Sequence, residues 1–99
     1  MNSRAIIDLR SKNISFHEIP DILENIKKYD NCGILIFDMS GCEYITSGVI
    51  GIIIEKSRKK ECYVIINTTK LYNLFQRLNI EEFIPIYKTI DEVIPLCTT

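Results

Sequence analysis

The sequence is poor in the residues on which metal binding and redox chemistry depend. It contains one histidine and no tryptophan in 99 residues, and His17 has no partner at metal-ligand spacing. The four cysteines are widely spaced and form no C-x-x-C pair: Cys32, Cys42, Cys62 and Cys97. This spacing is typical of buried, reduced thiols in an intracellular protein. We therefore expect no metal site and no cofactor.

One-sided charge and long apolar runs are also missing. The 12 basic and 13 acidic side chains are scattered along the chain, so no basic field favours nucleic acid or an anionic membrane surface. No apolar run approaches the roughly 18 residues that span a bilayer, and no secretion signal opens the chain. We expect a cytoplasmic protein with no nucleic-acid partner and no direct membrane insertion. The length suits a single domain over residues 1–99.

Sequence patterns of common enzyme sites are absent. No phosphate-binding G-x-x-x-x-G-K-[ST] run occurs, and the turn after the first expected strand reads R-S-K-N where a dinucleotide site needs glycines. Cys42 has no histidine nearby and no arginine about six residues on, where Gly48 stands. Asp38 and Glu43 suit turn-capping roles better than acid–base catalysis. We predict no catalytic residue and no enzymatic activity.

The pattern that is present alternates strands with helices. Apolar runs typical of strands cover residues 5–9, 33–38, 63–66 and 83–87. Helical signals cover residues 15–29, 47–59, 68–79 and 89–96, the first with a capping box at Ser15 and Glu18. Because Pro20 suits only the first turn of a helix, the first helix can instead begin near Ile19. This order predicts an α/β fold: a mainly parallel four-stranded sheet with packed helices, in which Pro85 puts the last strand at an edge.

The most informative stretch is residues 33–55, where a buried strand, a polar turn and a second apolar run follow one another. The turn after Asp38 lies at the carboxyl end of a strand, where parallel sheets meet ligands and partners. Ser47 occupies the position expected of a helix N-cap. A hydroxyl at the positive end of a helix can cap it, bind an anion or carry a phosphate.

This stretch, read as I-L-I-F-D-M-S-G-C-E-Y-I-T-S-G-V-I-G-I-I-I-E, resembles the central segment of the STAS family, which includes the bacterial anti-sigma factor antagonists. In that family a strand ends in D-L-S-G-V, and an aromatic and an apolar residue precede a D-S-S-G-L-G-type helix start. The positions that match without a gap are Asp38, Ser40, Gly41, Tyr44, Ile45, Ser47 and Gly51. The similarity spans roughly residues 34–96 and implies a STAS-like domain.

The resemblance also implies a regulatory phosphorylation site. In the antagonists, a partner kinase phosphorylates a serine at this helix start, and the phosphate breaks the complex. Here Thr46 stands at the family's aspartate, Ser47 at the first hydroxyl and Gly48 at the second, the usual acceptor. Relatives from stress-signalling complexes use the hydroxyl directly after the aspartate. The resemblance therefore implies Ser47 as the first phosphorylation candidate and Thr46 as the second.

Two functions from different classes follow. The leading one is a non-enzymatic bacterial module of transcription regulation and signalling that binds a protein partner, an anti-sigma factor kinase or a scaffold. Its expected binding residues are Cys42, Glu43, Tyr44, Thr46, Ser47, Gly48, Val49 and Ile50. The alternative is a small anion- or nucleotide-binding domain, a subunit of a transporter or lipid-trafficking complex, that uses the amides of Gly48 and Val49. The sequence leaves the oligomeric state open.

Overall fold

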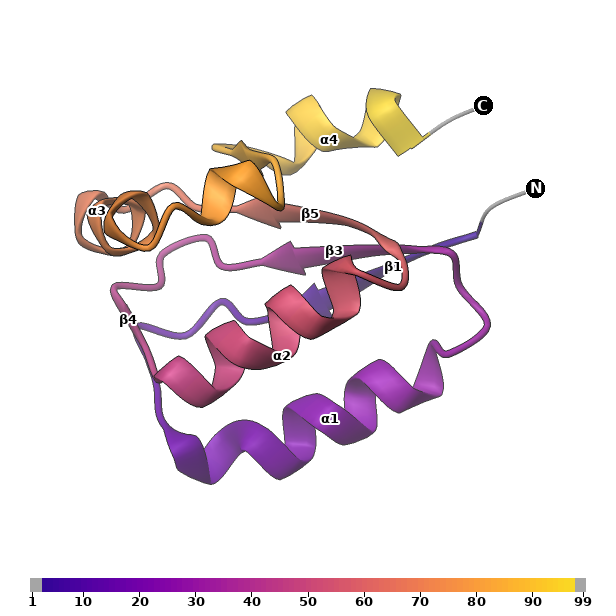
Figure 1. The fold of residues 1–99 in the computed structure, drawn as a ribbon, viewed down its shortest axis with the longest axis horizontal. Coiled ribbons are helices and arrows are strands. Elements are labelled where there is room, and N and C mark those ends of the chain that lie inside the picture. Colours follow the sequence, from indigo (N-terminus) through magenta and orange to yellow (C-terminus); the bar gives the residue numbers. More distant parts are fainter. Residues whose placement is uncertain (1–2, 98–99) are drawn as a thin grey trace.

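The structure, a computed structural model, describes residues 3–97; the thiol of Cys97 lies outside the described part. Strands and helices alternate along the chain, as the sequence predicts (Figure 1). The elements are β1 (Arg4–Asp8), β2 (Asn13–Ile14), η1 (Phe16–Glu18), α1 (Ile19–Lys28), β3 (Ile34–Asp38), β4 (Tyr44–Ile45), α2 (Ser47–Ser57), β5 (Glu61–Ile65), α3 (Thr69–Arg77), η2 (Ile80–Glu82), β6 (Ile86–Tyr87) and α4 (Ile90–Cys97). The labels η1 and η2 denote 3₁₀ turns.

The main sheet has four strands in the order β1-β3-β5-β6, and every neighbouring pair is parallel. This confirms the predicted fold class, including the edge position of the last strand. That strand is shorter than predicted, because the N–H groups of Phe83 and Ile84 donate back to the Ile80 carbonyl (2.9 and 3.0 Å) and Pro85 has no N–H, so the strand begins only at Ile86. Asp8 and Asp38 pair in register, so β1 and β3 end side by side.

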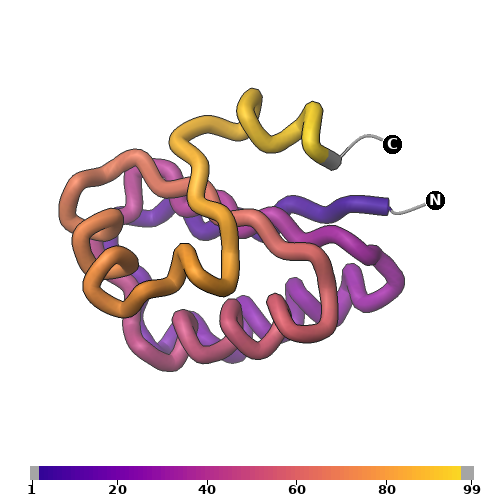
Figure 2. Tube along the Cα trace, turned by 45° about the horizontal axis from the view of Figure 1, so that its top comes forward, coloured from indigo at the N-terminus to yellow at the C-terminus, as the bar shows by residue number. Residues whose placement is uncertain are grey.

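Helices cover both faces of the sheet. In Figure 1, α1 and α2 lie below the strands and α4 lies above them, and the tilted view in Figure 2 keeps α4 on its own side. Side chains from alternate strand positions, such as Leu35, Phe37 and Val64, form the larger core with α1 and α2. The other face of β3 and β5 packs against Val93 of α4. β3 reads as a continuous apolar run because both of its faces are covered.

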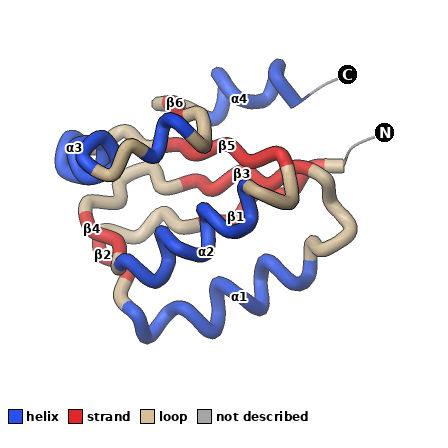
Figure 3. Tube along the Cα trace, viewed as in Figure 1, coloured by secondary structure: helices blue, strands red, loops and turns tan. Residues whose placement is uncertain are grey.

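A second, very small sheet joins β2 to β4 in parallel, with Asn13 opposite Tyr44 and Ile14 opposite Ile45. The sequence pattern predicted only a polar turn over residues 10–13, so this pairing is new. Ile14 and Ile45 are both buried, and their packing in the larger core holds the two short segments together. Figure 3 shows this sheet beyond the ends of β1 and β3, next to the starts of α1 and α2. It positions the candidate site.

Candidate functional site

The turn after β3 is built on Asp38. Its Oδ1 accepts hydrogen bonds from the Ser40 N–H (3.1 Å) and the Ser40 hydroxyl (2.6 Å). Gly41 then adopts a positive φ of 77°, a conformation that glycine reaches without strain, and the Cys42 N–H closes the turn on the Met39 carbonyl (3.0 Å). Asp38 therefore has the turn-capping role that the sequence predicted for it.

The end of the neighbouring strand holds this turn in place. The Gly41 N–H donates to Oδ1 of Asn67 at 2.8 Å, and the Thr68 hydroxyl donates to the Cys42 carbonyl. Both residues lie in the loop between β5 and α3, and the last residue of β5 pairs with Asp38. The carboxyl ends of adjacent parallel strands thus meet as expected, and the shape of the turn depends on residues 26 positions away in the sequence. The sequence places both residues after the third expected strand but gives no sign of this contact.

Arg10 lies across the ends of β1 and β3. Its Nε and Nη2 donate to the two carboxylate oxygens of Asp8 at 2.9 and 3.1 Å, and its Nε lies 4.0 Å from Oδ2 of Asp38. The hydrogen bonds from Arg10 lower the pKa of Asp8, and the nearby carboxylates raise the pKa of Arg10. The Asp8 carboxylate is therefore paired with Arg10, and the Asp38 carboxylate is hydrogen-bonded within its turn. These surroundings fit a structural role for both groups better than a role in proton transfer.

The start of α2 differs from the prediction by one residue. Thr46, not Ser47, is the N-cap, with extended backbone (φ −68°, ψ 149°), and its carbonyl accepts from the N–H groups of Val49 (3.0 Å) and Ile50 (3.4 Å). The Thr46 N–H donates to the Ile14 carbonyl at 3.0 Å, so the β2–β4 sheet holds Thr46 extended until the helix begins. Neither hydroxyl makes a side-chain capping bond, and Ser47 is the first helical residue.

The eight predicted binding residues divide by burial. Tyr44 (55% exposed), Ser47 and Gly48 are exposed, and Glu43 and Thr46 are half-buried. The prediction is wrong for Cys42, Val49 and Ile50, which are buried. All three belong to the larger core. Their apolar side chains stabilise the fold and do not reach the surface.

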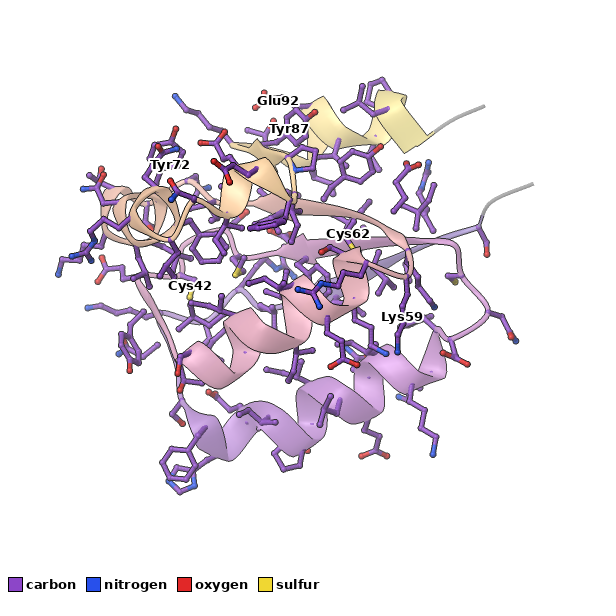
Figure 4. All side chains as sticks on the ribbon, in the orientation of Figure 1. Cys42, Lys59, Cys62, Tyr72, Tyr87 and Glu92 are labelled. Atoms are coloured by element: carbon purple, nitrogen blue, oxygen red, sulfur yellow. The ribbon has the colours of Figure 1, made fainter. Side chains whose placement is uncertain are left out.

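Cys42 has the surroundings of a structural thiol. Its Sγ donates to the Tyr44 carbonyl at 3.3 Å, and Figure 4 shows the side chain on the inner side of α2. Burial raises the pKa of this thiol, which opposes the thiolate form that a nucleophile needs. The geometry thus agrees with the sequence argument against catalysis at Cys42.

The structure adds a residue that the sequence did not single out. Phe16, in η1, is 63% exposed and stacks on His17 with ring centroids 4.1 Å apart. Residues on either side of Phe16 lie against the start of α2. The Ile14 carbonyl accepts a hydrogen bond from the Thr46 N–H, and Cδ1 of Ile19 lies 2.8 Å from where a Cβ on Gly48 would stand. The sequence offers only an aromatic residue inside the capping box of Ser15 and Glu18, and nothing in it shows that the ring is exposed. We name the group of Phe16, Tyr44, Ser47, Gly48 and the half-buried Thr46 the Ser47 surface.

The amide pair proposed for anion binding is not available as such. The Val49 N–H already donates to the Thr46 carbonyl.

A separate groove of about 610 Å³ lies where β5 and β6 end beside α3, and Figure 4 labels Tyr72, Tyr87 and Glu92 among its lining residues. Residues 3–97 contain no cluster of three or more side chains able to hold a metal ion, and no helix in the same range is long and apolar enough to cross a membrane.

Comparisons of this chain with protein-family models, with curated proteins and with solved structures found no match.

Proposed function

We propose that this protein is a non-enzymatic cytoplasmic signalling module that binds a regulatory kinase or scaffold protein through the Ser47 surface, with Ser47 phosphorylation as the switch. The function rests on the resemblance of residues 34–96 to anti-sigma factor antagonists. One structural observation carries it further. The Ser47 hydroxyl is exposed on the first residue of α2 and makes no capping bond, so its modification leaves the helix intact.

The surface around Ser47 has the composition of a modest protein interface. Tyr44 and Phe16 expose large rings beside the polar turn and the helix start. Aromatic side chains bury large areas at low entropic cost, and they are enriched among the residues that dominate binding energy. Beneath them, the turn clamped by Asn67 and the paired strands β2 and β4 provide a fixed backbone. A partner would therefore meet a preorganised surface.

A phosphate on Ser47 would act differently on the free domain and on the complex. The first turn of α2 contains no acidic side chain, and the helix dipole favours negative charge there, so the folded domain tolerates the group. Inside an interface, the same two negative charges would have to lose their hydration without an arranged counter-charge. Phosphorylation is thus expected to release the partner while the domain stays folded.

The phosphorylation test uses protein isolated from its native cell. Phosphopeptide mass spectrometry is expected to find the modification on Ser47, and Ser47→Ala should abolish it while Thr46→Val leaves it unchanged. The absence of phosphate from both residues under every growth and stress condition would remove the switch from the proposal.

The interface test compares two tyrosines. Tyr44→Lys is expected to reduce the affinity for the kinase or scaffold protein that co-purifies with the wild-type protein at least tenfold. Tyr29→Lys serves as the matched control, because Tyr29 is also exposed but caps the far end of α1. Equal loss of affinity in both variants, or none in Tyr44→Lys, would place the binding surface elsewhere.

A further inference from the structure

β1 leaves one edge of the main sheet open. Within residues 3–97, β3 is the only strand that pairs with β1. A groove of about 530 Å³ runs between this edge and α1, lined on the strand side by Ile7, Asp8 and Leu9, so the helix does not close the edge off. Unpaired backbone groups along a strand are a template for a further strand.

The hydrogen bonds to β3 show which backbone groups face outward. The Leu9 N–H donates to the Asp38 carbonyl (2.8 Å), and the Ile34 N–H donates to the Ser3 carbonyl (3.2 Å). Along a parallel strand, the N–H and C=O groups of one residue point to the same side, and those of the next residue point to the opposite side. The odd-numbered residues of β1 therefore direct their backbone groups toward β3. The N–H and C=O groups of the even-numbered residues, Arg4, Ile6 and Asp8, therefore point to the open edge.

The same three residues also share an exposed face. Burial alternates along β1, with Arg4, Ile6 and Asp8 exposed and Ala5 and Ile7 buried. Ile6 is 45% exposed and the Asp8 side chain 58% exposed. Ile6 thus lies between the Arg4 cation and the Asp8 carboxylate, which also accepts hydrogen bonds from the exposed Arg10 of its own chain. The backbone groups that point to the open edge belong to Arg4, Ile6 and Asp8 themselves.

The order of these side chains is self-complementary. When two β1 strands pair antiparallel about Ile6, Ile6 faces Ile6 of the other strand, and Arg4 faces Asp8 at both ends. All three pairs join residues with outward backbone groups, which is the hydrogen-bonded pairing of an antiparallel ladder. Directly opposed side chains lie about 5 Å apart at Cβ, close enough for the charges to attract. A shift by two residues sets a charge against Ile6 instead.

We propose that β1 pairs with β1 of a second copy of this chain, related by a two-fold axis perpendicular to the sheet. The two four-stranded sheets then join into one, with about six backbone hydrogen bonds across the axis. The rotation keeps α1 of both copies on one face and α4 of both copies on the other. Because the contact is a single short strand, the interface is small, and we expect a reversible dimer with a Kd of about 10–100 µM.

Analytical ultracentrifugation of the full chain between about 1 µM and 1 mM tests the dimer in the concentration range set by that affinity. Wild-type protein is expected to move from monomer to dimer, more weakly at high salt because the charge pairs are exposed. A monomer throughout the range overturns the proposal. The proposal is also overturned if the protein stays monomeric and its β1 edge binds a strand peptide of unrelated sequence, because the natural partner of that edge is then a different protein.

Charge exchange identifies the register. Arg4→Glu alone and Asp8→Lys alone each bring like charges together at both ends, so each variant is expected to remain monomeric. Mixing the two variants restores opposite charges at both ends, and the mixture is expected to form a heterodimer of near wild-type affinity. A monomeric mixture, with wild-type protein dimeric, overturns this pairing. Since both variants must fold for the mixture to associate, misfolding cannot imitate the expected result.

A matched pair of apolar positions controls for general stickiness. Ile6 and Leu23 are both 45% exposed, but Leu23 lies on α1. Ile6→Glu is expected to abolish the dimer by placing two carboxylates at the axis, whereas Leu23→Glu leaves it unchanged. Amide hydrogen exchange supplies an independent readout: the Arg4, Ile6 and Asp8 amides should gain protection as concentration rises. Loss of the dimer in Leu23→Glu alone would move the interface to α1 and overturn the pairing.

Discussion

Substitutions at Ser47 separate its two candidate roles, structural cap and exposed acceptor. If Ser47 capped α2, Ser47→Ala would cost about 1 kcal/mol of unfolding free energy. The structure assigns the cap to Thr46 and gives the Ser47 side chain no hydrogen bond. Since alanine is also the better helix former, by up to about 0.5 kcal/mol, Ser47→Ala is expected to be neutral or slightly stabilising.

Ser47→Asp measures how the site tolerates negative charge. An exposed charge in the first turn of a helix contributes about 0.3–1 kcal/mol at low salt, and no acidic side chain in the first turn of α2 opposes it. Ser47→Asn is the matched neutral control, because it has nearly the same shape. For a domain of this size, the aspartate variant should melt about 1–8 °C above the asparagine variant.

Urea denaturation at 25 °C, in low salt and in 1 M salt, gives the free energies directly. The difference between Ser47→Asp and Ser47→Asn should shrink at high salt, because an exposed charge is screened. A loss of about 1 kcal/mol in Ser47→Ala would show that Ser47 caps the helix after all. An aspartate no more stable than asparagine at low salt would refute the argument that the free domain accommodates a phosphate.

Three further predictions concern stability and titration. Gly51→Ala is expected to stabilise the protein by about 0.5–1 kcal/mol, because nothing lies within 4 Å of the added Cβ; Gly48→Ala should gain less, because its Cβ would meet an isoleucine of α1 at 2.8 Å, and thermal unfolding of both variants checks the order. Burial raises the pKa of Cys62 to about 11, so its contribution to stability should be lost as pH rises from about 8.5 to 11, and its alkylation at pH 8 should be slow in the folded protein; rapid labelling would contradict this. The pKa of Asp8 lies below its ordinary value of 3.8, so its interaction stabilises the fold above that pH and is lost on acidification; Arg10→Gln should return the pKa toward 3.8 in an NMR titration.

The sequence predicts the main sheet well, because its signal is local. The run from Ile34 to Phe37 is apolar at every position, and such a run flanked by turn residues has few alternatives to a strand buried on both faces. The left-handed stop at Asn79 and the edge position of the strand after Pro85 were also predictable, since each follows from the backbone preferences of one residue type.

The candidate site was predicted less well because its geometry depends on distant residues. β2 and β4 are two residues long, too short for any periodic pattern, yet their pairing makes Thr46 the N-cap of α2 in place of the predicted Ser47. Similarly, the burial of Val49 depends on how α2 lies on the sheet, and a helix that is apolar on nearly every side does not show which side faces solvent.

The parallel pairing of every strand in the main sheet also determines how the chain can assemble. Asp8 pairs with Asp38, thirty positions later, and no strand of this sheet pairs with its partner through a short hairpin. Each new strand must wait for an intervening helix to cross the sheet, and closing such long loops is slow compared with local contacts. During synthesis on the ribosome, β3 can therefore gain its second neighbour only after Ile65 has emerged. Until then the strand has an uncovered edge, and this interval is when the nascent chain is most exposed to mispairing.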